Sequence, residues 1–105
     1  MKISHLLILS GSLLLTGQAL AADNAELFKK SGCIACHQVA TKTVGPALKD
    51  IAAKYKGVPG AAATLAKKVR AGGSGNWGTV AMVPAPATVS DADLKILIAY
   101  VLSTK

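Results

Sequence analysis

The sequence has few of the residues from which a protein core is built. Aromatic residues make up 4% of its 105 residues, and 17 of the 42 apolar residues that follow position 21 are alanine. Alanine buries little surface, and a domain this small has little core to begin with. The length excludes a multidomain enzyme and a self-sufficient α/β nucleotide-binding fold. We therefore expect a staple or a large bound group to fill the core.

The sequence also has no apolar run of the roughly 20 residues that a membrane-spanning helix needs. Its longest apolar stretch, residues 6–15, follows Lys2 and precedes the small residues of Ala19-Leu20-Ala21. A basic start, a short apolar segment and a small-x-small site are typical of a secretory signal peptide. We predict cleavage after residue 21, a domain over residues 22–105, and export to the periplasm without stable membrane insertion.

Acidic residues are scarce. The chain has 12 basic and 5 acidic residues, a net charge of +7, and the loss of Lys2 with the leader leaves +6. The basic residues are scattered, and together with export this argues against a nucleic-acid partner. The charge serves either solubility alone or electrostatic steering toward acidic protein partners.

No stretch of the sequence alternates apolar and polar residues as a half-buried strand does, so we predict an all-α fold. Helical spacing of apolar residues predicts helices at about 25–31, 47–55 and 61–71, the last ended by Gly72-Gly73. Ser90 and Asp93 resemble a capping box that opens a final amphipathic helix. Residues 72–89 are rich in glycine, proline and alanine, and they predict a long loop.

The chemistry of the chain lies in Cys33-Ile34-Ala35-Cys36-His37. Two cysteines three positions apart and followed directly by histidine are typical of c-type haem attachment. Cys33 and Cys36 would lie one helical turn apart and reach the two vinyl groups of one porphyrin, with His37 directed at the iron. A thioredoxin-like redox pair would need a βαβ setting, which this sequence does not show. A zinc site would need four ligands, and only two cysteines and one histidine follow position 21. A disulfide between the two cysteines would close only a small loop.

The number of histidines and methionines in the chain predicts the second iron ligand. The chain has two histidines and two methionines, and loss of the leader removes His5 and Met1. Electron-transfer haems take a Met/His axial pair, so we predict Met82 as the partner of His37. The alternatives are Met82 as a core residue, and a lysine, the new amino terminus at Ala22, or water as the ligand.

The chain resembles the small bacterial class I monohaem cytochromes c of the c-551/c-552 type. The resemblance covers nearly all of residues 22–105 and rests on motifs in the same order and spacing. These are Cys33-Ile34-Ala35-Cys36-His37, Val44-Gly45-Pro46-Ala47, Lys49-Asp50-Ile51-Ala52-Ala53-Lys54-Tyr55, Gly75-Asn76-Trp77-Gly78, Met82-Val83-Pro84 and Val89-Ser90-Asp91-Ala92-Asp93. It implies about four helices wrapped around one covalently bound haem.

The resemblance also implies roles for single residues. Pro46 would accept a hydrogen bond from the imidazole of His37 through its backbone carbonyl, which fits the rule that such a partner orients a ligating histidine. Trp77 would donate its indole N–H to a haem propionate, and plain core packing is the alternative. The haem pocket or the contact between the terminal helices would be lined by Phe28, Ile51, Leu97 and Val101.

Three positions depart from the family pattern. Val83 stands where a proline commonly follows the methionine ligand, and Ala85 stands where an asparagine is common. Lys68 stands where some members have an arginine near the propionates. The resemblance therefore leaves the potential, the orientation of Met82 and the role of Lys68 unspecified.

These features predict an electron carrier that is not an enzyme, because both axial positions of the iron would be filled. The resemblance implies a quinol-oxidising complex as donor and a nitrite reductase or terminal oxidase as acceptor. We expect a monomer that docks on acidic surfaces of such redox proteins. The alternatives are a dedicated haem subunit of one periplasmic dehydrogenase or reductase complex, and a haem sensor or peroxidase-like enzyme.

Overall fold

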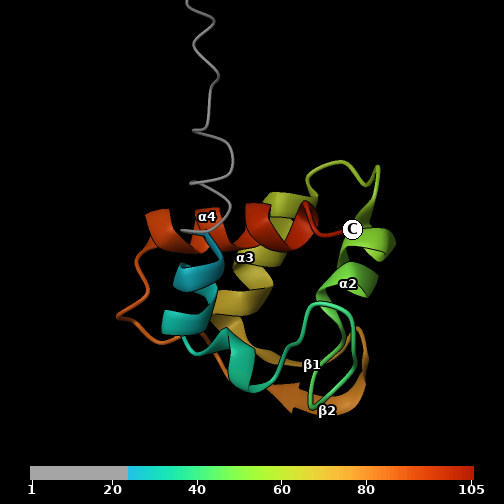
Figure 1. The fold of residues 1–105 in the computed structure, drawn as a ribbon, viewed down its shortest axis with the longest axis horizontal. Coiled ribbons are helices and arrows are strands. Elements are labelled where there is room, and N and C mark those ends of the chain that lie inside the picture. The colour runs from blue at the N-terminus through green and yellow to red at the C-terminus, as the bar shows by residue number, and fades with distance from the viewer. Residues whose placement is uncertain (1–23) are drawn as a thin grey trace, which may run out of the picture.

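A computed structural model describes residues 24–105 (Figure 1). The described part begins with a helix over residues 24–30. The elements that follow are, in order, η1 (Cys33–Ala35), α2 (Leu48–Tyr55), α3 (Ala61–Ala71), β1 (Gly73–Gly75), β2 (Gly78–Met82) and α4 (Asp91–Leu102). The four α-helices confirm the predicted fold class. The predicted signal peptide lies outside the described residues.

The helix boundaries follow from local signals. Gly60 and Gly72 bracket α3 with φ angles of 72° and 70°, a left-handed conformation that glycine adopts without steric cost. At α4, the Ser90 side chain accepts a hydrogen bond from the Asp93 amide at 3.1 Å, the predicted N-cap contact. Helix α3 begins and ends at the predicted residues 61 and 71, and the predicted N-cap of α4 is confirmed as well.

The core lies beneath α4, which packs against α2 and α3. Its larger side chains form one cluster of buried residues, namely Phe28, Leu48, Leu65, Val89, Leu94, Leu97, Ile98 and Val101, with Ile51 packed against it. The Phe28 and Tyr100 rings lie 5.5 Å apart and join the first and last helices. In the described part of the chain, Leu48 alone among the larger side chains is less than 2% exposed. The protein core is thin, as the composition predicts.

The structure differs from prediction at residues 73–82. The sequence predicts a loop there, but β1 and β2 pair as an antiparallel hairpin, with Gly73 opposite Met82 and Gly75 opposite Gly78. All positions of the two strands are exposed except Met82, which is half-buried. The described residues pack no side chains over either face of the hairpin, so the sequence lacks the apolar–polar alternation that identifies a strand. Met82 therefore ends a strand instead of lying within a loop.

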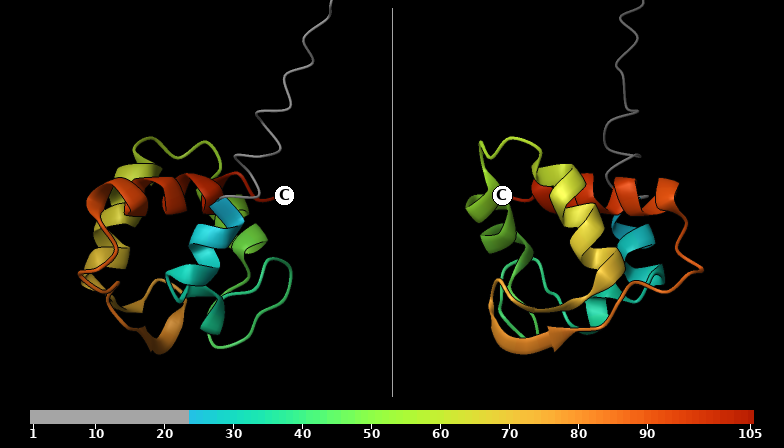
Figure 2. Two further views of the ribbon diagram at one scale, coloured as in Figure 1. Left: turned by 60° about the vertical axis from the view of Figure 1, so that its left-hand side comes forward. Right: turned by 180° about the vertical axis from the view of Figure 1, so that it is seen from behind.

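The elements divide between two ends of the domain. α4 crosses one end, and the hairpin and η1 lie together at the other in all three views (Figures 1 and 2). None of the helices within residues 24–105 has the length and apolar character needed to cross a membrane.

Candidate functional site

The two cysteines lie on a tight turn directly after the first helix. Gly32 has a φ of 83° and reverses the chain into η1, and the amides of Cys36 and His37 both donate to the Cys33 carbonyl, at 3.2 and 3.0 Å. Both cysteines are free and half-buried. Burial raises the pKa of the Cys33 thiol above its ordinary value, and the neighbouring Cys36 adds to the rise. The turn presents the two cysteines three positions apart on η1 and its C-cap.

The segment after His37 folds back onto this turn. The Cys36 carbonyl accepts from the Gly45 amide and from the Thr43 hydroxyl, both at 2.8 Å. At the other end of the segment, the Leu48 amide donates to the Gln38 carbonyl at 2.9 Å. These bonds fix the loop and thereby fix the position of Pro46 relative to the histidine.

His37 donates its Nδ1–H to the carbonyl of Pro46 at 2.8 Å. This contact has the geometry that the resemblance implies for the two residues. A donor at Nδ1 sets the tautomer, so that Nε2 carries a lone pair and is free to coordinate a metal. The half-buried imidazole is therefore oriented as an iron ligand would be.

Gly45 lies directly against the same imidazole. A Cβ at this position would lie 2.5 Å from Cε1 of His37 and 2.9 Å from Nδ1. Such distances are too short for any side chain, so glycine at position 45 is what lets the loop cover the ring.

Met82 lies at the end of β2, on the same end of the domain as η1 (Figure 2). The carboxyl end of α3 packs on the backbone that follows it. A Cβ at Gly72 would lie 2.7 Å from the Met82 carbonyl oxygen and 2.8 Å from the Pro84 nitrogen. The Ala85 amide then donates to the Val69 carbonyl at 2.9 Å. The backbone of Met82 is thus held against α3.

Trp77 lies in the turn of the hairpin and is 44% exposed. The Lys54 ammonium lies 4.4 Å from the centre of its ring and donates to the Asn76 carbonyl at 2.7 Å. A cation over an indole face is attractive, so Lys54 ties the hairpin turn to α2. This leaves the indole accessible to a bound group.

Two basic residues of α3 have separate roles. The Lys68 ammonium lies 3.5 Å from the Ser74 carbonyl and so bonds to the hairpin. Arg70, which the sequence analysis missed, bonds to the segment between β2 and α4 and to Asp91. Arg70 is the only arginine in the chain, and that rarity was the available signal.

The residues at this end of the domain fit a covalently bound haem. Two free thiols one turn apart match two vinyl groups, and the adjacent histidine has its coordinating nitrogen free. Cys33 itself packs against the core, as do the half-buried side chains of Ile51, Tyr55 and Val69. A porphyrin would add the apolar area that the thin core lacks.

The comparisons with known proteins agree with this fit. The family model for cytochrome c matches residues 21–105. Cytochrome c-552 of Nitrosomonas europaea is 53% identical over 96 residues, which are 91% of this chain and 90% of that protein. Cytochrome c-551 of Pseudomonas aeruginosa is 48% identical over 99 residues, covering 94% of this chain and 92% of the relative.

The fold agrees as well. The crystal structure of wild-type Nitrosomonas europaea cytochrome c552 superposes with a TM-score of 0.72 at 57% identity, covering 77% of this chain and 99% of that one. The chain therefore belongs to the cytochrome c family, among its small c-551/c-552-type members, and carries haem c covalently through Cys33 and Cys36.

Proposed function

We propose that the protein is a periplasmic carrier of single electrons, with residues 22–105 as the exported domain and His37 and Met82 as the two axial ligands of the haem iron. When bound, the haem supplies an iron that cycles between the ferrous and ferric states. The chain supplies the attachment, the ligands and the surface that meets redox partners.

The observation that carries this proposal is the hydrogen bond from Nδ1 of His37 to the Pro46 carbonyl at 2.8 Å. It leaves Nε2 available on one side of the haem. Met82 is the only methionine within residues 24–105, and α3 holds its backbone. With both axial positions filled by side chains, substrate and oxygen have no coordination site, which favours a carrier over an enzyme.

Trp77 supports the same assignment. Its indole is 44% exposed, and the Lys54 ammonium lies 4.4 Å from the centre of the ring. We propose that its N–H donates to a haem propionate. The resulting bond would fix the haem on the side of the hairpin.

We propose that redox partners dock on exposed apolar side chains near the attachment site. Val39, Val80 and Val83 are exposed by 48%, 68% and 76%. They belong to the segment after His37 and to the hairpin and its exit, which lie at one end of the domain (Figure 2). A carrier must also release its partner, so we expect an interface below about 1,200 Å². Quinol-oxidising complexes as donors, and nitrite reductases or terminal oxidases as acceptors, are the partners that this function implies.

Replacement of Met82 tests the ligand assignment. We expect ferrous wild-type protein not to bind carbon monoxide, because its sixth position is filled. Met82→Ala should bind carbon monoxide and have a lower reduction potential, because the thioether that favours ferrous iron is gone. Absorption spectroscopy and potentiometry measure the two effects. Val83→Ala, which shortens the next side chain, serves as the matched control and should retain both wild-type properties.

A wild-type spectrum and potential in Met82→Ala would show that another group is the ligand. Carbon monoxide binding by the wild-type protein would instead favour a sensor or peroxidase-like enzyme. Stoichiometric co-purification with one dehydrogenase or reductase would favour a dedicated subunit over a mobile carrier.

A further inference from the structure

The segment that follows Met82 has few means of holding itself in place. Residues 83–87 read Val-Pro-Ala-Pro-Ala, and none of these side chains can form a hydrogen bond. The two prolines also lack a backbone N–H. Val83 is 76% exposed and adds little packing. Within the connection itself the Val89 amide donates to the Pro86 carbonyl at 2.9 Å, and the remaining hydrogen bonds to residues 83–87 come from α3.

α3 provides such contacts at its carboxyl end. Gly72 packs on the Met82 carbonyl and the Pro84 nitrogen, and the Val69 carbonyl accepts from the Ala85 amide at 2.9 Å. These contacts hold the first half of the segment, next to Met82.

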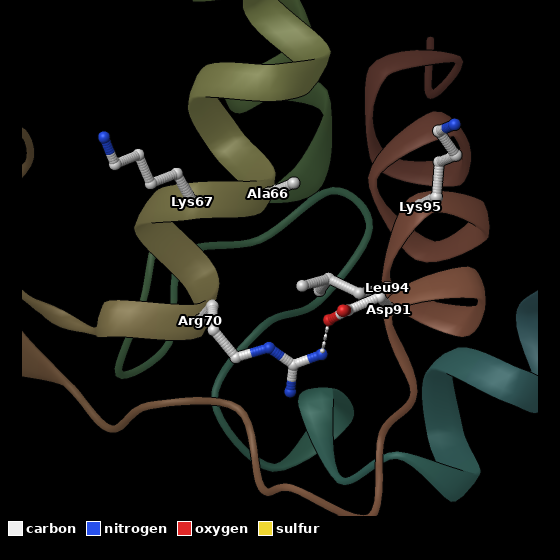
Figure 3. A pocket seen from close by; sticks show the side chains of 6 residues that line it. All are labelled: Ala66, Lys67, Arg70, Asp91, Leu94 and Lys95. Carbon is white, nitrogen blue, oxygen red and sulfur yellow. Dashed lines mark hydrogen bonds and ion pairs between the residues drawn. The ribbon is translucent and has the colours of Figure 1, made fainter.

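Arg70 holds the second half. Its guanidinium donates to the Pro86 carbonyl at 3.2 Å and to the Val89 carbonyl at 2.8 Å, and it pairs with Asp91 at 2.9 Å (Figure 3). The planar fork of arginine can serve several acceptors at once, and charged donors form stronger hydrogen bonds than neutral ones. The Asp91 carboxylate is 99% exposed, so the ion pair is the weaker part of this set. Arg70 thus joins α3 to two points of the connection between β2 and α4 and to the first residue of α4.

We propose that Arg70 is a positioning residue for Met82. By clamping residues 86–91 to α3, it shortens the free length of chain behind Met82 and opposes withdrawal of the thioether from the iron. The inference rests on the proposed ligation by Met82. In this inference Arg70 lowers the rate at which Met82 leaves the sixth coordination position of the iron, in addition to stabilising the fold.

The test measures capture of imidazole by the ferric holoprotein. Imidazole can bind the iron only after Met82 has left, so at saturating imidazole the binding rate reports that departure. Arg70→Met keeps the aliphatic stem and removes every donor. We expect it to raise the rate about tenfold, the factor that corresponds to roughly 1.4 kcal/mol. Arg70→Lys retains one charged donor and should restore part of the wild-type rate.

Two control variants separate positioning from overall stability. Asp91→Asn weakens the exposed ion pair and leaves the two carbonyl bonds, so the rate should change by less than about twofold. Ile98→Val removes a methylene from the α4 face of the core and lowers overall stability without removing any of the three Arg70 contacts. Its imidazole rate should equal that of the wild type. Equal acceleration in Ile98→Val and Arg70→Met would overturn the proposal.

Amide hydrogen exchange supplies a readout that does not depend on the iron. Exchange at Ala85 should be faster in Arg70→Met, because that amide bonds to α3 directly before the clamped residues 86–91. Faster exchange with an unchanged imidazole rate would overturn the positioning role. If Met82→Ala alters the spectrum while Arg70→Met binds imidazole as the wild type does, this inference alone fails. A wild-type spectrum in Met82→Ala overturns the ligation itself and, with it, this inference.

Discussion

At the residue scale, Gly45 has no side chain, and the His37 ring fills the space where one would lie. The Cβ position is 2.5 Å from the ring, while the neighbouring Pro46 carbonyl accepts the Nδ1–H. The loop therefore both covers and orients the imidazole. A substitution at Gly45 should therefore change the coordination of the iron by His37, although Gly45 itself contains no group that could coordinate the iron.

We predict that Gly45→Ala displaces the His37 ring and stretches its bond to Pro46. Forcing an extra methyl group into a packed site costs about 1–3 kcal/mol of unfolding free energy. Denaturant titration of the holoprotein measures the loss, and the haem absorption spectrum should change with it. Gly57→Ala is the control, because its φ of 73° strains any side chain while no atom lies within 4 Å. It should lower stability with a wild-type spectrum. An unchanged spectrum in Gly45→Ala would contradict the prediction.

How far the site could be predicted depended on the kind of group involved. Cys33, Cys36 and His37 are adjacent in the sequence, so their chemistry was visible in the spacing alone. The bond between His37 and Pro46 was implied by the resemblance, and the structure contains it. The Arg70 contacts could not be predicted, because two of its three acceptors are backbone carbonyls, which every residue has.

At the scale of elements, the helices could be predicted and the hairpin could not. Helix α3 lies between two glycines that must adopt a left-handed conformation, and its apolar residues repeat at helical spacing. Strands β1 and β2 have neither signal. Their residues are mostly glycines and small side chains without apolar alternation, so pairing depends on backbone bonds.

The α4 helix supplies four of the buried side chains of the core, namely Leu94, Leu97, Ile98 and Val101. Its start is set by Ser90. We predict that Ser90→Ala lowers the unfolding free energy by about 1 kcal/mol, because the Asp93 amide loses its acceptor. Guanidinium denaturation of the holoprotein measures the change.

Ser103→Ala is the matched control at the opposite end of the same helix. The Ser103 hydroxyl donates to the Tyr100 carbonyl at an exposed site, so its loss should cost less than about 0.5 kcal/mol. Equal losses in the two variants would mean that the cap contributes nothing specific to α4.

At the scale of the whole molecule, a prediction concerns processing. The exported protein should begin at Ala22, and its intact mass should equal that of residues 22–105 plus one haem, because both thiols are consumed in thioether bonds. Intact-mass spectrometry checks both claims. Two free thiols, or haem that acid acetone extracts, would contradict covalent attachment through Cys33 and Cys36.

The net charge of +7, or +6 without the leader, gives a second prediction. The second-order rate of electron transfer to an acidic acceptor should fall steeply between low and physiological salt, because salt screens steering between unlike charges. Stopped-flow spectroscopy across ionic strength measures the effect. A flat profile would leave the charge without a role in docking and assign recognition to the apolar side chains.

Two charge-reversing substitutions test which part of the surface contributes to electrostatic steering. Lys42 lies in the loop beside Val39 and Val44, whereas Lys95 lies on α4 at the other end of the domain. Lys42→Glu should slow the reaction at low salt more than Lys95→Glu does. Equal effects would mean that net charge acts without regard to position.

The small number of fully buried side chains has a consequence for the life of the protein in the cell. With Leu48 alone enclosed to that degree among its larger described side chains, the polypeptide by itself has little to hold it together. Because a group that binds only the folded state shifts the balance toward that state, we expect the folding of this chain to depend on receipt of its porphyrin. We expect a chain that receives none to be degraded by proteases. The abundance of the protein should then follow the supply of haem, so that the size of the electron-carrying pool is matched to cofactor synthesis without a dedicated regulator.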